Sequence, residues 1–343
     1  MWIYFALGLA QESTPVYMLG NLACYDLNTP QPAGWEAFTD CLGPWVALQA
    51  YKQRKVLPEF KNSPALLDPT LKVKNNGGQP GEGLIITASE QLQANPKPNI
   101  MLGNSWSSVS MASNAFMSSV KELQLGYSST NAKLSNKAQY PYFMRVIAPD
   151  SLQSMALVKV ILELGYDQVT CMHSDDSYAE ALALDFRTFA KEDGIAVSMF
   201  PLPYGLYDAW PSVMANAVAQ GKKKLSTKWH VVWAAVSGDV PAFWKHMVEA
   251  GIANGDNVVI GAEAFGTTRV APETFGSMGV MPVSKGAMWP EFVDFWKTFR
   301  LADLPDDVRA LADAVGYTDE NFKNGDTAGS TCLSASTVCL PHF

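Results

Sequence analysis

The fold is decided by residues 107–180, which read SSVSMASNAFMSSVKELQLGYSSTNAKLSNKAQYPYFMRVIAPDSLQSMALVKVILELGYDQVTCMHSDDSYAE. Short apolar runs predict strands at 123–127 and 143–147, and a helix is expected from about Ser108. After Asp150 the alternation of helix and strand becomes regular. This part of the chain therefore sets the expectation for the rest.

The segment after Asp150 predicts a helix that Asp150 caps, with Gln153 at the capping-box position, and that Gly165 ends. Its core-facing side is expected to carry Leu152, Met155, Val158 and Leu162. Strict alternation predicts a parallel sheet covered by helices on both faces, with ligands at the carboxyl ends of its strands. The alternating elements are strands at 169–173, 195–200, 230–235 and 258–261, and helices at 178–191, 211–219 and 240–250.

The flanking parts of the chain are less regular. A helix is predicted at 45–55, and the Pro-, Gly- and Asn-rich residues 62–83 are expected to form a loop. Residues 99–103 predict a strand that ends at a glycine before a serine-rich loop. Beyond 280, an aromatic-rich helix is expected to return to the first part of the chain.

Composition excludes several classes of protein. The chain has 343 residues, of which 48% are hydrophobic and 17% charged, enough to bury two cores. The net charge is −8, and the single basic run, residues 222–224, is more typical of a solvated surface than of a nucleic-acid patch. Nucleic acid is therefore not an expected partner.

The N-terminus and the cysteines indicate an oxidising compartment. Residues 1–11 resemble a signal peptide, although the segment carries no Lys or Arg and could instead be a first core strand. Local spacing favours two disulfides, and Cys171 is expected to stay reduced and buried. The expected pairs are Cys24 with Cys41 and Cys332 with Cys339.

Catalytic and metal-binding patterns do not occur. The four histidines show no ligand spacing, and no nucleophile elbow, phosphate-binding loop or dinucleotide fingerprint is present. No cofactor and no metal are expected. An enzyme remains the alternative from a different class, opposed only by the lack of a catalytic set.

The ordered motifs in residues 103–180 resemble the ligand-binding region shared by class C G-protein-coupled receptors, natriuretic-peptide-type receptors and bacterial amino-acid-binding proteins. No single motif is specific, but the set is. The motifs are Gly103 with Ser107-Ser108-Val109, Tyr127-Ser128-Ser129-Thr130, Leu134–Lys137, Tyr142–Val146, Pro149-Asp150 and Asp176-Ser177-Tyr178.

The resemblance implies a two-lobed α/β clamshell of the type 1 periplasmic-binding-protein-like kind, each lobe a mostly parallel sheet with helices on both faces. The family pattern continues beyond Phe343, so the first lobe is expected to be incomplete. The expected parts are a signal peptide at 1–11, lobe 1 at 12–150, lobe 2 at 151–280 and a return to lobe 1 at 281–343.

The same resemblance implies an amino-acid site between the lobes. A carboxylate is recognised by hydroxyls and free N–H groups at a helix start, and an ammonium by a carboxylate and an aromatic face. Glu263 departs from the family, whose amino-acid-binding members usually carry Asp there. The first-lobe residues are Ser108, Ser128 and Thr130, Asp150 lies near the crossing, and Tyr178 and Glu263 belong to lobe 2.

Each residue also has a purely structural explanation. Ser108 and Asp150 are common helix caps, and the ring of Tyr178 could pack against Met172 or Phe186. Trp106, the one large residue of the serine-rich loop, could wall the cleft and select side-chain size or simply pack between lobes. The ordered set favours ligand binding over these alternatives.

Three functions fit the resemblance. The first is the extracellular domain of a membrane receptor that senses an amino acid, signals by lobe closure, is held at the membrane by segments outside this chain and forms a homodimer through lobe 1. The second is a secreted or periplasmic amino-acid-binding protein of a transporter. The third is a receptor-cyclase-type domain that binds a peptide at its surface.

Overall fold

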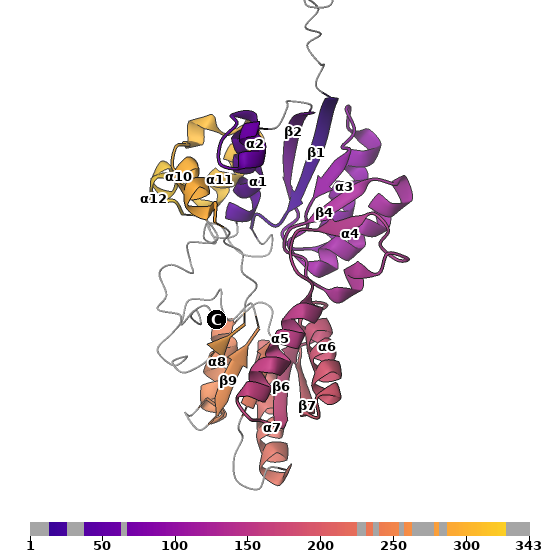
Figure 1. Cartoon of the computed structure of the whole chain (residues 1–343), viewed down its shortest axis with the longest axis vertical. Coiled ribbons are helices and arrows are strands. Elements are labelled where there is room, and N and C mark those ends of the chain that lie inside the picture. The colour runs from indigo at the N-terminus through magenta and orange to yellow at the C-terminus, as the bar shows by residue number, and fades with distance from the viewer. Residues whose placement is uncertain are drawn as a thin grey trace, which may run out of the picture.

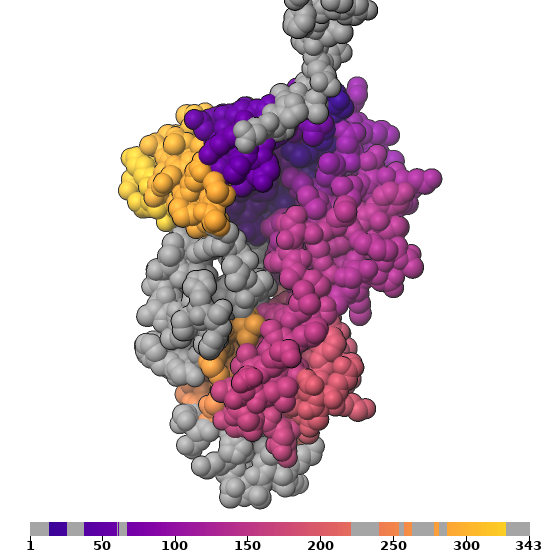
Figure 2. Space-filling model, viewed as in Figure 1, coloured from indigo at the N-terminus to yellow at the C-terminus, as the bar shows by residue number. Residues whose placement is uncertain are grey.

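The computed structural model describes most of the chain and shows two α/β lobes (Figure 1). Each lobe has its own parallel sheet, and the chain crosses from the first to the second just before Asp150. In Figure 2 the molecule narrows on one side where the two lobes meet. The residues described are 14–25, 38–62, 67–224, 231–235, 240–253, 257–262, 278–280 and 287–326.

The first lobe is built on a five-stranded sheet with the order β2-β1-β3-β4-β5, in which all pairs are parallel. The central strand β1 pairs with both neighbours, so that Leu19 lies opposite Lys72 on one side and Met101 on the other. The strands are β1 (Thr14–Leu22), β2 (Leu67–Asn75), β3 (Ile100–Leu102), β4 (Leu123–Gly126) and β5 (Phe143–Arg145).

Helices cover both faces of this sheet. On one face α3 (Pro80–Gln93) and α4 (Ser107–Val120) lie side by side over a small cluster of Leu19, Met101 and Met117. The other face carries the larger core of the lobe. The helices there are α1 (Thr39–Lys52), α2 (Pro58–Asn62), α10 (Trp289–Trp296), α11 (Asp306–Val315) and α12 (Asp319–Asn324).

The last helices complete the first lobe through aromatic packing. The ring of Trp45 on α1 meets that of Phe299 edge-on at 5.0 Å, and Phe38 lies 5.3 Å from Tyr317. The buried indole N–H of Trp296 donates to the Tyr317 hydroxyl at 3.0 Å. Burial of apolar and aromatic area is the main stabilising contribution to a core. Because residues 287–326 share this core with α1, they are part of lobe 1.

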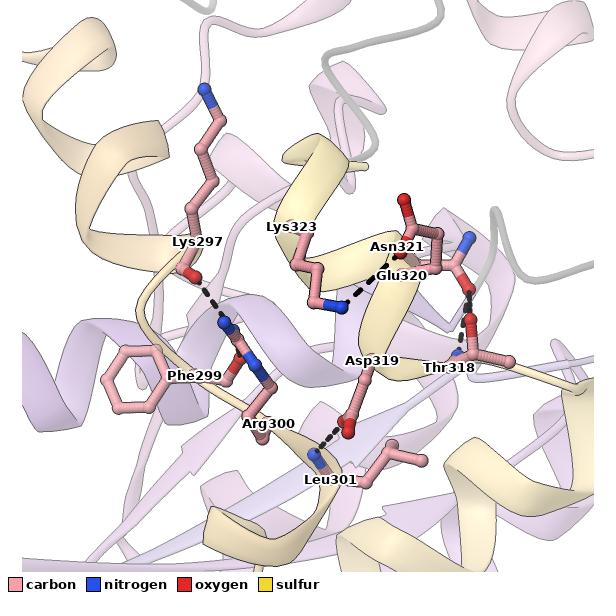
Figure 3. A network of polar contacts seen from close by, with 9 residues as sticks. All are labelled: Lys297, Phe299, Arg300, Leu301, Thr318, Asp319, Glu320, Asn321 and Lys323. Atoms are coloured by element: carbon pink, nitrogen blue, oxygen red, sulfur yellow. Dashed lines mark hydrogen bonds and ion pairs between the residues drawn. The ribbon is translucent and has the colours of Figure 1, made fainter.

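The turns between these helices are held by polar contacts (Figure 3). The short helix η4 (Leu301–Asp303) begins where Asp319 accepts the Leu301 N–H at 2.8 Å, and Arg300 donates to the Lys297 carbonyl at 2.9 Å. At the start of α12, the Asn321 side chain accepts the Thr318 N–H at 2.8 Å. These bonds satisfy N–H and C=O groups that helix ends leave unpaired.

The second lobe repeats the layered arrangement with the strand order β10-β9-β8-β6-β7, again parallel. Adjacent residues of β6 point to opposite faces, so that Cys171 packs under α5 and α6, whereas Met172 packs under α7 and α8. The elements are α5 (Asp150–Glu163), β6 (Gln168–Ser174), α6 (Ala179–Glu192), β7 (Ala196–Leu202), η2 (Tyr207–Ala209), α7 (Trp210–Lys224), β8 (Val231–Ala235), α8 (Val240–Glu249), β9 (Val258–Gly261) and β10 (Met278–Gly279).

The structure corrects two expectations. Residues 62–83 are not a loop, because they contain the nine-residue strand β2 and the start of α3. Buried Pro69 and Val73 alternate with exposed Lys72 and Lys74 in β2, a period of two that the turn-forming residues around it concealed. β2 lies at the edge of the sheet, where a proline is tolerated.

The expected core face of α5 is also wrong. Of the four expected residues only Val158 is buried, and Leu152, Met155 and Leu162 are exposed; the buried face is formed with Leu157 and Ile161. Apolar residues surround most of this helix, so its periodicity fits two different faces. Packing against α6 selects between them, and the Ser154 hydroxyl donates to the Leu182 carbonyl at 3.1 Å.

One disulfide joins Cys24, just after β1, to Cys41 in the first turn of α1. The two Cα atoms lie 5.4 Å apart, within the usual range for a disulfide. Cys171 is reduced and buried. The other expected pair, Cys332 and Cys339, and the expected signal peptide lie outside the described residues.

Within the part of the chain that the structure describes, no helix combines the length and apolarity that crossing a bilayer requires.

Removing the disulfide should destabilise the chain. The bridge closes a loop with a sequence separation of 17, so replacing both cysteines by alanine should lower the free energy of unfolding by about 3 kcal/mol through the unfolded state. Urea unfolding measures the loss. A thiol reductant should lower the midpoint of the natural protein more than that of the double variant. Equal midpoints for the two proteins under oxidising conditions would contradict the prediction.

Candidate functional site

The carboxyl ends of the first-lobe strands lie at the edge of the sheet that faces the second lobe (Figure 1). The loop after β3 leads into α4, and the loop after β4 carries residues 127–131. In parallel α/β sheets this edge is where ligands bind. The candidate site is therefore built from these loops and from the facing loop after β6.

A chain of buried amide side chains holds the strand ends together. Asn76, after β2, donates from Nδ2 to Oδ1 of Asn21 in β1 and to Oδ1 of Asn104 after β3, at 2.9 Å in both cases. Asn21 donates in turn to the Gly83 carbonyl at 2.7 Å and to the Thr87 hydroxyl at 2.9 Å. Each of the three asparagines is fully buried, so each bond replaces one that water would otherwise supply.

Serine hydroxyls extend this network into the two loops of the site. Ser110 Oγ accepts the Asn104 N–H at 2.9 Å and lies 2.7 Å from Ser129 Oγ, which also bonds the Asn104 carbonyl at 2.8 Å. Ser107 Oγ accepts the Asn131 N–H at 3.2 Å. Ser107, Ser110 and Ser129 are therefore structural residues that fix the loops.

The three predicted carboxylate ligands lie in the loops that this network holds. Ser108 is half-buried in the first turn of α4, Ser128 is half-buried after β4, and Thr130 is buried. None of the three hydroxyls forms a hydrogen bond within the described ranges. The start of a helix also leaves its first N–H groups unpaired, so the site offers donors of two kinds to an anion.

Asp150 lies at the crossing between the lobes, with 1% of its surface exposed. Its N–H donates to the Thr130 carbonyl at 2.9 Å, which joins the crossing to the loop after β4. The expectation that Asp150 caps α5 is wrong. Pro149 occupies the N-cap position, and Asp150 is the first helical residue, where the helix dipole still favours its negative charge.

Arg145 is the cation that faces Asp150. Burial lowers the pKa of Arg145, and the charge of Asp150 opposes that shift. The guanidinium donates from Nη1 to the carbonyls of Ser129 at 3.2 Å and Asn131 at 3.0 Å. Arg145 thereby holds the loop after β4 against the crossing.

Tyr178 occupies the N-cap position of α6 in the second lobe. Oδ1 of Asp176 accepts the N–H groups of Tyr178 at 2.9 Å and Ala179 at 3.2 Å, so Asp176 is the side chain that caps this helix. The ring of Tyr178 is half-buried against the core that contains Phe186, as its structural explanation anticipated.

One hydrogen bond brings the two lobes together at the site. Nδ2 of Asn131 in lobe 1 donates to the Ser177 carbonyl in lobe 2 at 2.5 Å. Thr130 and Tyr178 adjoin these two residues in sequence. The structure therefore brings Thr130, Asp150 and Tyr178 into one region, whereas Glu263 lies outside the described residues.

A carboxylate that sequence reasoning missed also belongs to this edge of the sheet. Oδ2 of Asp40, in the first turn of α1, lies 3.5 Å from the Ser105 hydroxyl, which in turn bonds the Tyr127 hydroxyl. Burial raises the pKa of Asp40 to about 6, and the bond from Ser105 opposes this shift. The pKa of Tyr127 is raised well above its ordinary value by burial and then by the charge of Asp40.

The sequence contained only part of the information needed to place Asp40 at the site. Its neighbour Cys41 predicted an anchored segment, but no motif connects Asp40 to a loop 65 residues away. Trp106, the other residue singled out in this loop, is 44% exposed, and a Cβ at Gly78 would lie 3.2 Å from its indole. The ring therefore packs against the first lobe and is not buried between the lobes.

Metal binding finds no support in the described residues, where no group of three or more His, Cys, Asp or Glu could hold an ion. His173, the histidine of β6, bonds the Ser174 carbonyl through Nδ1 at 3.0 Å. Burial lowers the pKa of His173, with nearby acidic groups opposing the shift. The hydroxyls, amides and carboxylates of the loops described above suit the binding of a small polar molecule.

Two parallel α/β lobes with polar loops at facing strand ends define a type 1 periplasmic-binding-protein-like ligand-binding domain. A family model described as "Receptor family ligand binding region" matches residues 57–285, and the chain belongs to that family. It is a ligand-binding region of the kind that class C membrane receptors carry on their extracellular side, and its disulfide suits an oxidising compartment.

Curated relatives include three receptors. The chain is 32% identical over 99 residues to a probable metabotropic glutamate receptor of Caenorhabditis elegans, 29% over 115 residues to taste receptor type 1 member 3 of Canis lupus familiaris, and 33% over 94 residues to metabotropic glutamate receptor 8 of Homo sapiens. The matched parts cover 29%, 33% and 27% of this chain and 10%, 14% and 10% of the relatives.

Breaking the amide chain should destabilise the first lobe. Asn76→Ala leaves the buried side-chain oxygens of Asn21 and Asn104 without their donor, and should lower the free energy of unfolding by about 1–3 kcal/mol per unsatisfied group. Chemical unfolding of the full chain measures the change. The control is Asn216→Ala, an exposed asparagine of α7, with an expected change under about 0.5 kcal/mol. Equal losses in the two variants would show that the network is not stabilising.

Proposed function

We propose that the chain binds a small amino acid, or a close analogue, between its lobes and that the lobes close on it. The observation that carries the proposal is the Asn131–Ser177 bond, which joins the loop of Thr130 to the loop of Tyr178 across the lobes. A ligand at this place would contact both lobes. It would shift the equilibrium toward closure by its difference in affinity for the closed and open forms.

The carboxylate end of the ligand would be held by the first lobe. Ser108 and Ser128 carry hydroxyls that make no hydrogen bond in the described chain, and Ser108 lies at the start of a 14-residue helix. Unpaired N–H groups and the positive end of the helix dipole both favour an anion there. Thr130 supplies a third hydroxyl from the neighbouring loop.

The ammonium end would meet Asp150, the ring of Tyr178 and Glu263. Asp150 is a buried carboxylate at the crossing, and the half-buried ring of Tyr178 offers an aromatic face to a cation. Glu263 follows β9 in sequence and belongs to the proposal through the family resemblance alone. Its longer side chain makes it the weakest member of the set.

In this proposal the chain is the extracellular ligand-binding domain of a membrane receptor, without enzymatic activity, and a segment outside residues 1–343 carries the signal. The curated relatives support a receptor over a transporter component, since those compared are receptors. The transporter-type binding protein and the peptide-binding receptor remain the alternatives. Binding of a peptide and of no amino acid would favour the latter.

Loss of a single hydroxyl should weaken binding strongly. Thr130→Ala and Ser108→Ala each remove a hydrogen bond to a charged group, worth about 1.5–3 kcal/mol, so affinity should fall roughly 10- to 150-fold. Calorimetric titration of the full chain with the common amino acids measures this. The matched control is Ser119→Ala at the other end of α4, whose hydroxyl bonds the Phe116 carbonyl. Unchanged affinity in both site variants would refute the site, and binding of no amino acid would refute the proposed function.

The receptor reading includes a homodimer through lobe 1, and α3 offers a surface for it. Leu84, Ile85 and Leu92 lie on one side of this helix and are 38%, 61% and 65% exposed. Leu84 and Leu92 are eight residues apart, about two helical turns. An apolar surface that two copies share would bury the same side chains on each partner.

Disrupting this surface should separate the partners. The full chain is expected to sediment as a dimer, and Ile85→Glu with Leu92→Glu to sediment as a monomer, because two buried like charges on each side oppose association. The control is Leu206→Glu, which changes an equally exposed leucine of the second lobe. A monomeric natural chain, or a dimer that survives the double substitution, would exclude this interface.

A further inference from the structure

Asp40 lies beside the loops of the candidate site. It is the second residue of α1, and the disulfide from Cys41 ties this end of the helix to the end of β1. Its carboxylate approaches Ser105 at 3.5 Å, and the hydroxyl of Ser105 bonds that of Tyr127. Ser105 precedes Ser108 in the loop into α4, and Tyr127 precedes Ser128. The carboxylate therefore lies at the same sheet edge as the proposed carboxylate-binding hydroxyls.

The charge of Asp40 has no cationic counterpart among the described residues. No lysine, arginine or histidine there lies within ion-pair distance of it, and its pKa is shifted by burial and by Ser105 alone. The Ser105 hydroxyl contacts the carboxylate without neutralising it. Enclosing a carboxylate without a cation costs free energy. A bound cation would offset this cost.

The carboxylate is enclosed and still reached by solvent. Protein surrounds Asp40 closely enough to raise its pKa to about 6, yet the residue keeps an intermediate exposed fraction. By contrast, solvent does not reach the structural residues Ser107, Ser110 and Ser129, since all three are buried.

Trp106 provides an aromatic surface next to Ser105. Its indole rests on Gly78, which has a φ of +72° and no Cβ to push the ring away, while 44% of the residue stays exposed. The ring is thus supported on the first-lobe side and open elsewhere. Aromatic faces, carboxylates and hydroxyl oxygens are the groups that bind organic cations.

We propose that Asp40 selects amino-acid ligands whose side chain carries a positive charge. This inference rests on the proposed function and names the class of its ligand. With the α-carboxylate at Ser108 and Ser128 on the first lobe, a cationic side chain extends toward Asp40 and neutralises it. An acidic side chain in the same place meets an uncompensated carboxylate and is rejected, as specificity by like charge requires.

Lysine and norleucine form a matched pair for the test, because both have an unbranched four-carbon side chain and only lysine ends in an ammonium. Titration calorimetry with the full chain should give a lysine affinity at least about tenfold above that of norleucine, with glutamate weaker than both. Asp40→Asn keeps the size of the side chain and removes its charge. In that variant lysine and norleucine should bind with similar affinity.

Asp185→Asn is the matched control. Asp185 is a half-buried carboxyl of α6 in the second lobe, and burial raises its pKa too. Its substitution should leave the preference for lysine intact. Circular dichroism and thermal unfolding of Asp40→Asn verify that the variant is folded.

The pH dependence of the natural chain supplies a test that needs no variant. Because the pKa of Asp40 is raised to about 6, its charge is complete above that pH and is lost as the pH falls through it. The preference for lysine over norleucine should therefore be full near pH 8 and shrink toward pH 5. The groups that face Asp40 do not titrate in this window, since Ser105 is neutral and the pKa of Tyr127 is raised further from it.

The possible outcomes distinguish failure of this inference from failure of the proposed amino-acid binding. Binding of amino acids with no preference for lysine, or a preference that survives Asp40→Asn and low pH, overturns the role of Asp40 and leaves the amino-acid site standing. Failure of every amino acid to bind overturns the proposed function itself. Loss of the preference in Asp40→Asn, with its retention in Asp185→Asn, supports the inference.

Discussion

Asn21, Asn76 and Asn104 hold together the ends of three neighbouring strands through amide hydrogen bonds, and the site depends on this buried chain. An amide side chain has both a donor and an acceptor, so a row of amides can link one strand end to the next by hydrogen bonds without any charge. Once buried, such a network is costly to break in part, because each group left unpaired has lost its water as well. The serine loops of β3 and β4 are fixed to the far end of this chain, at Asn104.

The contact between the lobes has a different character. Within each lobe the elements are joined by apolar cores, whereas the described contacts at the crossing are hydrogen bonds, from Asn131 to Ser177 and from Asp150 to Thr130. A hydrogen bond exposed on opening is exchanged for one to water at a small net cost, about 0.5–1.5 kcal/mol. An interface of this kind would allow the lobes to move relative to each other while each keeps its shape, as the proposed closure on a ligand requires.

The electrostatics of the first lobe distinguish two carboxylates. Asp150 is buried, its charge acts on the pKa of Arg145, and its own N–H bonds the Thr130 carbonyl. Asp40 is enclosed with hydroxyls and has no cation near it in the described chain. The contacts of Asp150 link the crossing to the first lobe, whereas a cationic ligand at Asp40 is our proposal.

Sequence alone determined the class of fold, and it nominated the residues of the candidate site. The regular alternation after Asp150, together with the ordered motifs of residues 103–180, was sufficient for two parallel α/β lobes, because period and turn chemistry are local properties. The pairing of Cys24 with Cys41 was within reach for the same reason. Local information failed at β2, whose alternation was short and surrounded by turn residues, and at α5, whose apolar residues fit two faces.

Only the tertiary structure decided which polar residues stay available. Ser107, Ser110 and Ser129 look like Ser108 and Ser128 in sequence, yet their hydroxyls are committed to the loops. Asp40 stands 65 residues from Ser105, and no pattern relates them until α1 is packed against the sheet. Burial and hydrogen bonding are properties of the neighbours that folding brings together, and for this reason no inspection of the chain by itself could assign them.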